Sequence, residues 1–84
     1  MMSKKQRRKL ILEIIDNQIR DNNPPETKQT LDRLISEGFS TEGAKDMIGY
    51  VVISEMSDML KGEETFNEQR FVAALNRLPE MPEE

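Results

Sequence analysis

The sequence predicts an all-α protein: a small four-helix domain with a long apolar central helix at about residues 41–61. Three observations predict this fold. Apolar residues recur at steps of three and four through most of the chain, which is the spacing of one helix face. Proline, glycine and cap residues separate these periodic segments. The β-branched run Val51-Val52-Ile53 has no partner strand in the sequence, and a lone strand would leave its backbone groups unsatisfied. The length of 84 residues suits one domain.

The first predicted helix covers residues 4–22, and the second covers about residues 24–37. The stretch "NNPP" separates them, because proline cannot extend a helix from its interior but fits the first turn of the next one. Asn23 is the expected N-cap of the second helix, with Pro24 as its first residue. Gly38 is the expected left-handed residue after its end.

The third predicted helix begins after Ser40, its expected N-cap, and continues to near Lys61. The fourth begins after Asn67, which is also a good cap residue, and Pro79 ends it. Strand-like residues inside the third helix are expected to be tolerated, because packing outweighs helix propensity.

The third helix carries an apolar arc that is wider than the roughly 100° stripe of a surface helix. Such a helix either lies at the centre of its own domain or also faces a second subunit. Methionines suit both packed cores and adaptable binding surfaces. Gly49, in the middle of the helix, either allows another helix to approach closely or is simply tolerated. The candidate interface residues of a homodimer are Phe39, Met47, Gly49, Val52, Met56 and Met59.

Glu55 lies inside this apolar arc. A carboxylate buried without a partner is costly, so Glu55 needs a cation nearby. Arg7, Arg33 and Arg70 are the candidates, and Arg70 is the predicted partner in a buried ion pair. Metal sites in helical bundles combine several glutamates with histidine. The sequence has no histidine, so a structural pair is favoured over a metal or catalytic role.

Charge is divided unevenly along the chain. Residues 1–9, the basic head, carry five cations and no acid, whereas the remaining residues carry 16 acids and seven cations. Residues 79–84 form an acidic, proline-containing tail that is predicted to be disordered. The basic head predicts either a solvated, partly frayed helix start or a contact with RNA, DNA or anionic lipid. The candidate polyanion contacts are Lys4, Lys5, Arg7, Arg8 and Lys9.

Several classes of function are disfavoured by residue types that the sequence lacks. Cysteine and histidine are absent, which removes thiolate nucleophiles, sulfur-ligated metals and the commonest general base. The four glycines are scattered, so they form no phosphate-binding loop. Apolar runs are far shorter than the roughly 20 residues of a membrane-spanning helix, and acids interrupt any signal-peptide core. The expectation is a cytoplasmic, non-enzymatic protein with no cofactor, metal or small-molecule substrate.

Two resemblances concern the turn between the second and third helices. Gly38, Phe39, Ser40 and Ala44 resemble the helix–Gly-Phe–helix corner of ubiquitin-associated (UBA-like) domains, which implies partner binding through Phe39. The same turn is similar to that of DNA-binding helix-turn-helix motifs. The helix that would read DNA, however, carries two acids and no arginine among residues 41–46.

The span from Asn23 to Pro79 resembles a group of small uncharacterised bacterial helical proteins. This resemblance implies a helical fold and no particular activity. The residues that carry it are Pro24, Pro25, Glu26, Thr30, Leu31, Arg33, Leu34, Gly38, Ala44 and Ile48.

Together these features predict a small protein-interaction module that is homodimeric through the third helix. The alternative is an accessory protein that binds nucleic acid or an anionic membrane through the basic head.

Overall fold

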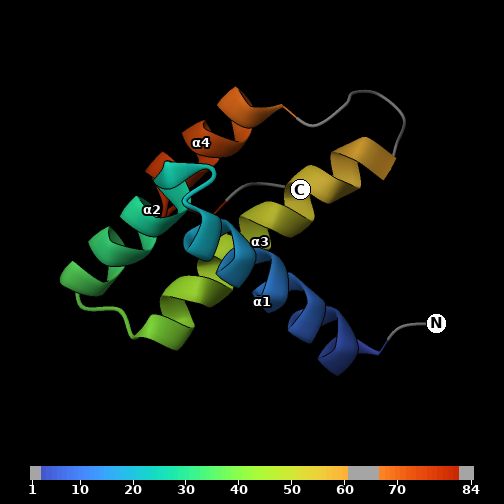
Figure 1. The fold of residues 1–84 in the computed structure, drawn as a ribbon, viewed down its shortest axis with the longest axis horizontal. Coiled ribbons are helices and arrows are strands. Elements are labelled where there is room, and N and C mark those ends of the chain that lie inside the picture. The colour runs from blue at the N-terminus through green and yellow to red at the C-terminus, as the bar shows by residue number, and fades with distance from the viewer. Residues whose placement is uncertain (1–2, 61–66, 82–84) are drawn as a thin grey trace.

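The computed structural model describes residues 3–60 and 67–81, and this part of the chain forms the predicted all-α fold (Figure 1). Its helices are α1 (Lys4–Asp21), α2 (Pro25–Ser36), α3 (Thr41–Leu60) and α4 (Glu68–Arg77). Residues 82–84, and with them half of the predicted acidic tail, lie outside the described residues. No helix in the described part is long and apolar enough to span a membrane.

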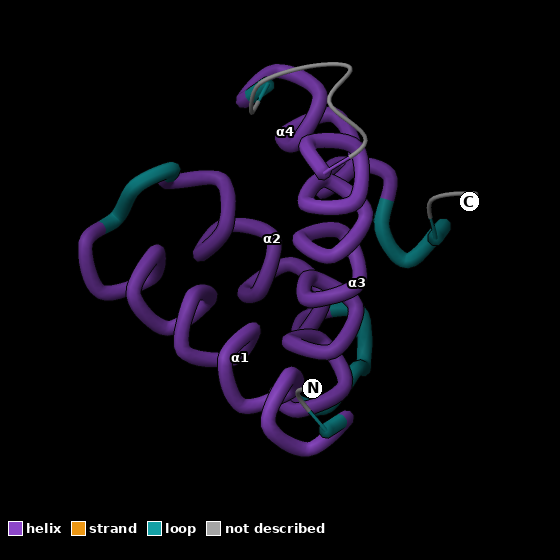
Figure 2. Tube along the Cα trace, turned by 90° about the vertical axis from the view of Figure 1, so that its right-hand side faces the viewer, coloured by secondary structure: helices purple, strands orange, loops and turns teal. Residues whose placement is uncertain are grey.

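The long helix α3 is the centre of the fold. It packs against all three other helices, and α2 packs against both α1 and α4. Figure 2 shows α3 rising through the molecule with α1 and α2 beside it and α4 near its upper end. The part of the apolar arc formed by Ala44, Ile48, Val51 and Val52 is covered within the same chain, which favours one of the two explanations that the sequence left open, whereas Ile53 and Met56 stay exposed.

The hydrophobic core lies where the other helices meet α3. Val51 and Val52, from the strand-like run, are almost fully buried in it, whereas Ile53 is 37% exposed. Burial of these side chains explains why a helix forms despite their β-preference, because tertiary packing overrides propensity. The core residues are Ile11, Ile15, Leu31, Leu34, Ala44, Ile48, Val51, Val52, Phe71, Leu75 and Leu78.

The predicted caps confirm that local chemistry sets most helix boundaries. Gly38 has a φ of +106°, the left-handed conformation expected after α2. The Ser40 hydroxyl accepts a hydrogen bond from the Gly43 N–H at 3.0 Å, as an N-cap of α3 does. The Asn67 side chain likewise accepts from the Arg70 N–H at 3.0 Å, at the start of α4.

The start of α2 differs by one residue from the prediction. Pro24 is extended, with φ −76° and ψ 150°, and the helix begins at Pro25 without a side-chain cap. The cause is steric, because the ring of Pro25 disfavours the helical conformation at the residue before it. Asn23 therefore does not cap α2. The preceding helix, α1, ends at Asp21, and Asn22 directly after it adopts a left-handed φ of 50°.

Candidate functional site

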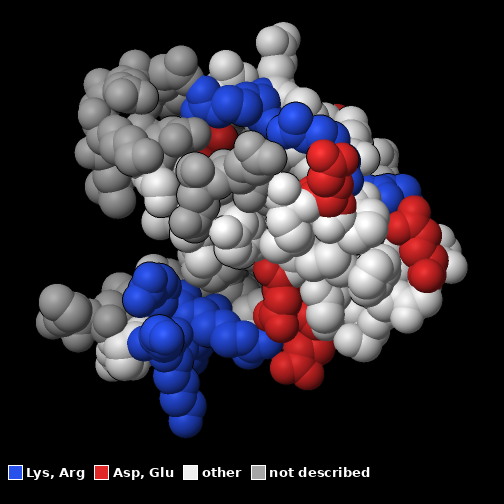
Figure 3. Space-filling view, turned by 180° about the vertical axis from the view of Figure 1, so that it is seen from behind, with Lys and Arg blue, Asp and Glu red and all other residues white. Residues whose placement is uncertain are grey.

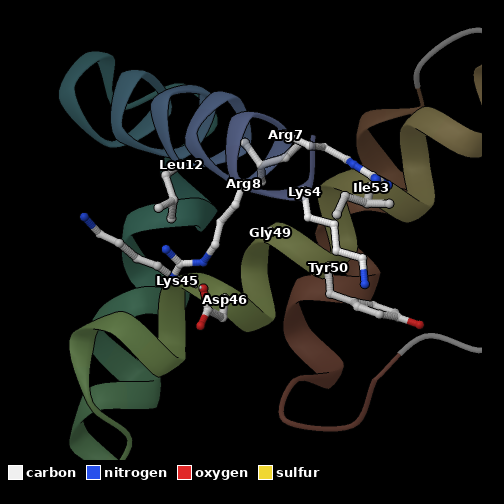
Figure 4. A pocket seen from close by; sticks show the side chains of 10 residues that line it. Lys4, Arg7, Arg8, Leu12, Lys45, Asp46, Gly49, Tyr50 and Ile53 are labelled. Atoms are coloured by element: carbon white, nitrogen blue, oxygen red, sulfur yellow. Dashed lines mark hydrogen bonds and ion pairs between the residues drawn. The ribbon is translucent and has the colours of Figure 1, made fainter. Parts of the chain in front are cut away.

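A groove between the first half of α1 and the middle of α3 is the main candidate site (Figure 4). Its volume is about 320 Å³. Each helix forms one wall. The residues of each wall are spaced three or four positions apart along the helix, so they share one face. The lining residues, which we call the α1–α3 groove, are Lys4, Arg7, Arg8, Ile11, Leu12, Lys45, Asp46, Gly49, Tyr50 and Ile53.

Gly49 determines how closely the two walls approach each other. A Cβ atom at this position would lie 3.0 Å from Ile11 Cγ2 and 3.6 Å from Ile15 Cδ1, so a larger residue would require the Ile11 side chain, or α1 with it, to shift. Of the two explanations that the sequence left open for Gly49, these distances favour close approach of another helix, and that helix is α1 of the same chain. Tyr50 and Ile53 lie beside Gly49 on α3 and leave apolar surface facing the groove (Figure 4).

The first turn of α1 is ordered by a capping box. The Ser3 hydroxyl accepts from the Gln6 N–H at 3.2 Å, and the Gln6 side chain accepts from the Ser3 N–H at 3.0 Å. The helix consequently begins at Lys4. The pattern Ser-x-x-Gln at residues 3–6 is itself a sequence signature of a helix start.

The charges of the groove differ between its two ends. Arg8 donates to Glu42 at 3.2 Å and to Asp46 at 2.8 Å, and Lys45 donates to Asp16 at 2.8 Å. These exposed ion pairs connect α1 to α3 and are each expected to contribute less than about 1 kcal/mol.

Lys4 and Arg7, nearer the start of α1, form no ion pair with any described residue. In Figure 4 both extend from α1 toward the side of the groove where Tyr50 and Ile53 lie. Figure 3, which shows the molecule from behind, has Lys and Arg side chains projecting together at the lower left. Lys5 and Lys9 are also exposed on α1, but they do not line the groove. The predicted polyanion contacts therefore divide into a groove set and an outward set.

Two residues of the predicted homodimer surface are buried inside their own chain, which corrects their assignment. Gly49 faces α1, and Val52 is 6% exposed. Met47 is half-buried against the core, whereas Phe39 and Met56 are exposed. The side chain of Met59 lies outside the described part of the structure. Sequence periodicity could not detect this burial, because it shows which residues share a face and not what covers that face.

Glu55 is 6% exposed and lies against Arg70, the partner that the sequence predicted. Arg70 Nε donates to Glu55 Oε2 at 3.1 Å, and Arg70 Nη2 donates to Glu55 Oε1 at 2.5 Å. The Asn67 N–H lies 3.4 Å from Glu55 Oε1. Arg33, another candidate partner, instead donates to two backbone carbonyls at the end of α4. The Glu55–Arg70 pair thus holds the start of α4 against α3, away from the groove.

The sequence did not single out Leu12, Lys45, Tyr50 or Ile53 as site residues, although they share the groove with Lys4 and Arg7. Their spacing on α1 and α3 was readable, but the pairing of those two faces was not. Within residues 3–60 and 67–81, no group of three or more metal-ligating side chains is placed to hold an ion.

Comparison with family models, with curated proteins and with solved structures found no match to this chain. The function is therefore inferred from the groove itself.

Proposed function

We propose that this protein is a small, non-catalytic interaction module that binds a partner protein through the α1–α3 groove. One observation carries the proposal: half-exposed apolar side chains and cations without ion pairs to other described residues share one concave surface. Apolar contact and charge complementarity are the two components that combine in specific protein interfaces.

The chemistry of the groove favours binding over catalysis. Asp46 is its lining carboxylate, and Arg8 already forms a hydrogen bond to it at 2.8 Å. The sequence supplies no histidine or cysteine to work beside this acid. A general acid–base mechanism needs a titratable group that lies within hydrogen-bond reach of the substrate and has a pKa near the working pH. Asp46, paired and half-exposed, is poorly suited to that role.

Homodimerisation is a special case of this proposal, but α3 is not its best surface. Gly49 and Val52 are buried within the chain, so a second copy would have to contact other residues. Two copies joined groove to groove in parallel would also bring their Lys4 and Arg7 side chains together, and such like charges repel. Sedimentation equilibrium tests this case, and we expect a monomer at micromolar concentration.

Binding of nucleic acid or an anionic membrane through the basic head is a second candidate. Four cations near the start of α1 favour this candidate, because they form no ion pair with described residues. They are Lys4, Lys5, Arg7 and Lys9. The carboxylates of Glu42 and Asp46 beside Arg8 weigh against it, because phosphates would be repelled there. Apolar groove walls also contribute little to phosphate contacts.

Affinity capture with matched baits tests the proposed function. Wild type, Ile53→Ser and Ile35→Ser are compared in extracts of cells that make the protein, with quantitative mass spectrometry. Ile53 and Ile35 are 37% and 40% exposed, and only Ile53 lines the groove. We expect partner proteins to be retained by wild type and by Ile35→Ser but lost from Ile53→Ser. Equal retention by all three baits would refute the groove as the binding surface.

A further inference from the structure

We infer that the α1–α3 groove takes one amphipathic α-helix of a partner protein, with acidic residues concentrated at the end that meets the start of α1. This inference rests on the proposed function and names the class of partner. It follows from the backbone of the walls, from the apolar residues of the groove and from the change in charge along it.

The walls of the groove favour a helical occupant over an extended one. Both walls are α-helices, whose backbone N–H and C=O groups bond within the helix. A peptide in the β conformation gains affinity by pairing with an open sheet edge, and the described residues contain no strand. A helix satisfies its own backbone and presents only side chains, so it can lie in the groove without unsatisfied polar groups.

The apolar part of the groove suits the hydrophobic stripe of such a helix. Tyr50 and Ile53 lie on α3, and Leu12 lies opposite on α1. Ile11 and Gly49 are buried beneath them and form the floor of the groove. A volume of about 320 Å³ is at the low end for a small-molecule site, which spans roughly 300–1,000 Å³. It suits a few anchoring side chains spaced three or four residues apart.

The charges of the groove set which end of the bound helix carries the acidic residues. Lys4 and Arg7 are three residues apart on the same face of α1 and form no ion pair with described residues, so they can meet acids of a partner. Further along, Arg8 is paired with Glu42 and Asp46, and Lys45 is paired with Asp16. Acids of the partner are therefore favoured near Lys4 and Arg7 and not beyond them. A uniformly anionic polymer would meet both regions and gain from only one.

Two charge-matched double variants separate groove contacts from diffuse attraction. Lys4→Glu/Arg7→Glu changes cations that line the groove, and Lys5→Glu/Lys9→Glu changes cations of the same helix that do not. Both change the net charge by the same amount. Each also puts an acid in the first turn of α1, which the helix dipole favours. Circular dichroism melts of both variants check that the fold is retained.

The binding partner in the test is a synthetic amphipathic peptide of about 15 residues, a length that supports partial helicity. It carries leucines at helical spacing and glutamates at one end, and fluorescence anisotropy reports its binding to the full-length chain. Because the contact is small, we expect weak binding, with a Kd of about 1–100 µM. Lys4→Glu/Arg7→Glu should weaken binding at least about tenfold and Lys5→Glu/Lys9→Glu less than about threefold. Ile53→Ser should also weaken binding at least about tenfold, and Ile35→Ser should not.

Three results would overturn the inference. The first is absence of binding to the peptide, and the second is equal binding to a peptide of the same composition in scrambled order. The third is tighter binding to single-stranded DNA or to phosphatidylserine vesicles, weakened alike by both double variants. If the peptide fails while affinity capture still depends on Ile53, the helical occupant is wrong and the proposed function stands. If both experiments fail, the proposed function is refuted as well.

Discussion

Arg70→Met is expected to destabilise the fold more than Glu55→Met, although both variants remove the same ion pair. The Glu55 side chain is 8% exposed, whereas that of Arg70 is 33% exposed. Losing Arg70 leaves a buried carboxylate whose remaining described donor is the Asn67 N–H at 3.4 Å. Losing Glu55 leaves a guanidinium that can turn toward water. The asymmetry in burial should therefore appear as an asymmetry in stability.

The expected magnitudes follow from these exposures. Breaking a buried ion pair by removing one partner costs roughly 3–5 kcal/mol. Because a third of Arg70 reaches solvent, water can enter the space it vacates, and we expect a loss of about 2–3 kcal/mol for Arg70→Met. Glu55→Met leaves the Asn67 N–H without this acceptor, and we expect a loss of about 1 kcal/mol. The double variant should be no less stable than Glu55→Met, since apolar replacement of both partners is often neutral.

Urea unfolding followed by far-ultraviolet circular dichroism measures these differences. With an m-value of about 1 kcal/mol/M, Arg70→Met should lower the unfolding midpoint by about 2–3 M. A chain of this length is expected to have a total stability of about 4–12 kcal/mol, so the loss is easily detected. Arg77→Met, an exposed arginine on the same helix, is the control and should change stability by less than about 0.5 kcal/mol. Equal losses in the two single variants, or additive losses in the double variant, would refute the reasoning.

Three further variants test the packing and the caps. Gly49→Leu forces a side chain toward Ile11 Cγ2, so we expect a loss of at least about 2 kcal/mol in thermal denaturation; an unchanged melting temperature would contradict the close approach of α1. Arg33→Lys keeps the charge but cannot donate in the same way to two carbonyls of α4, so about 1 kcal/mol should be lost, and wild-type stability would argue against this contact. Asn67→Ala removes the N-cap of α4 and should cost about 1 kcal/mol, with faster amide exchange in its first turn; unchanged exchange would show that the cap is dispensable.

Much of the fold was predictable because its signals act over short distances. Gly38, Ser40 and Asn67 each act on the backbone within about one turn of themselves, so the sequence alone located them as caps. The prediction was wrong by one residue at Pro24 because two local rules conflict there. Proline is favoured at the first helical position, but a residue followed by proline is disfavoured there, and the second rule prevailed.

The candidate site was only partly predictable. The charge of the basic head identified Lys4 and Arg7 as candidate binding residues, but no sequence signal identified Tyr50 and Ile53, which line the same groove. Those two residues lie on the same apolar helix as core residues such as Ile48 and Val51, and nothing local distinguishes the two groups. Glu55 was a different case, because a carboxylate in an apolar arc needs a cation and few cations were available.

By itself, the sequence determined that this chain is helical, where its helices begin and end to within about one residue, and that a basic segment precedes an acidic body. Only the tertiary structure decided which helix covers each face of α3. A helical wheel gives a side chain its direction but not its neighbour, and α1 takes its position because Gly49 leaves room for Ile11. This packing of α1 on α3 covers Gly49, a residue expected at a dimer interface, and it brings Lys4 and Arg7 to the apolar side chains with which they form the groove.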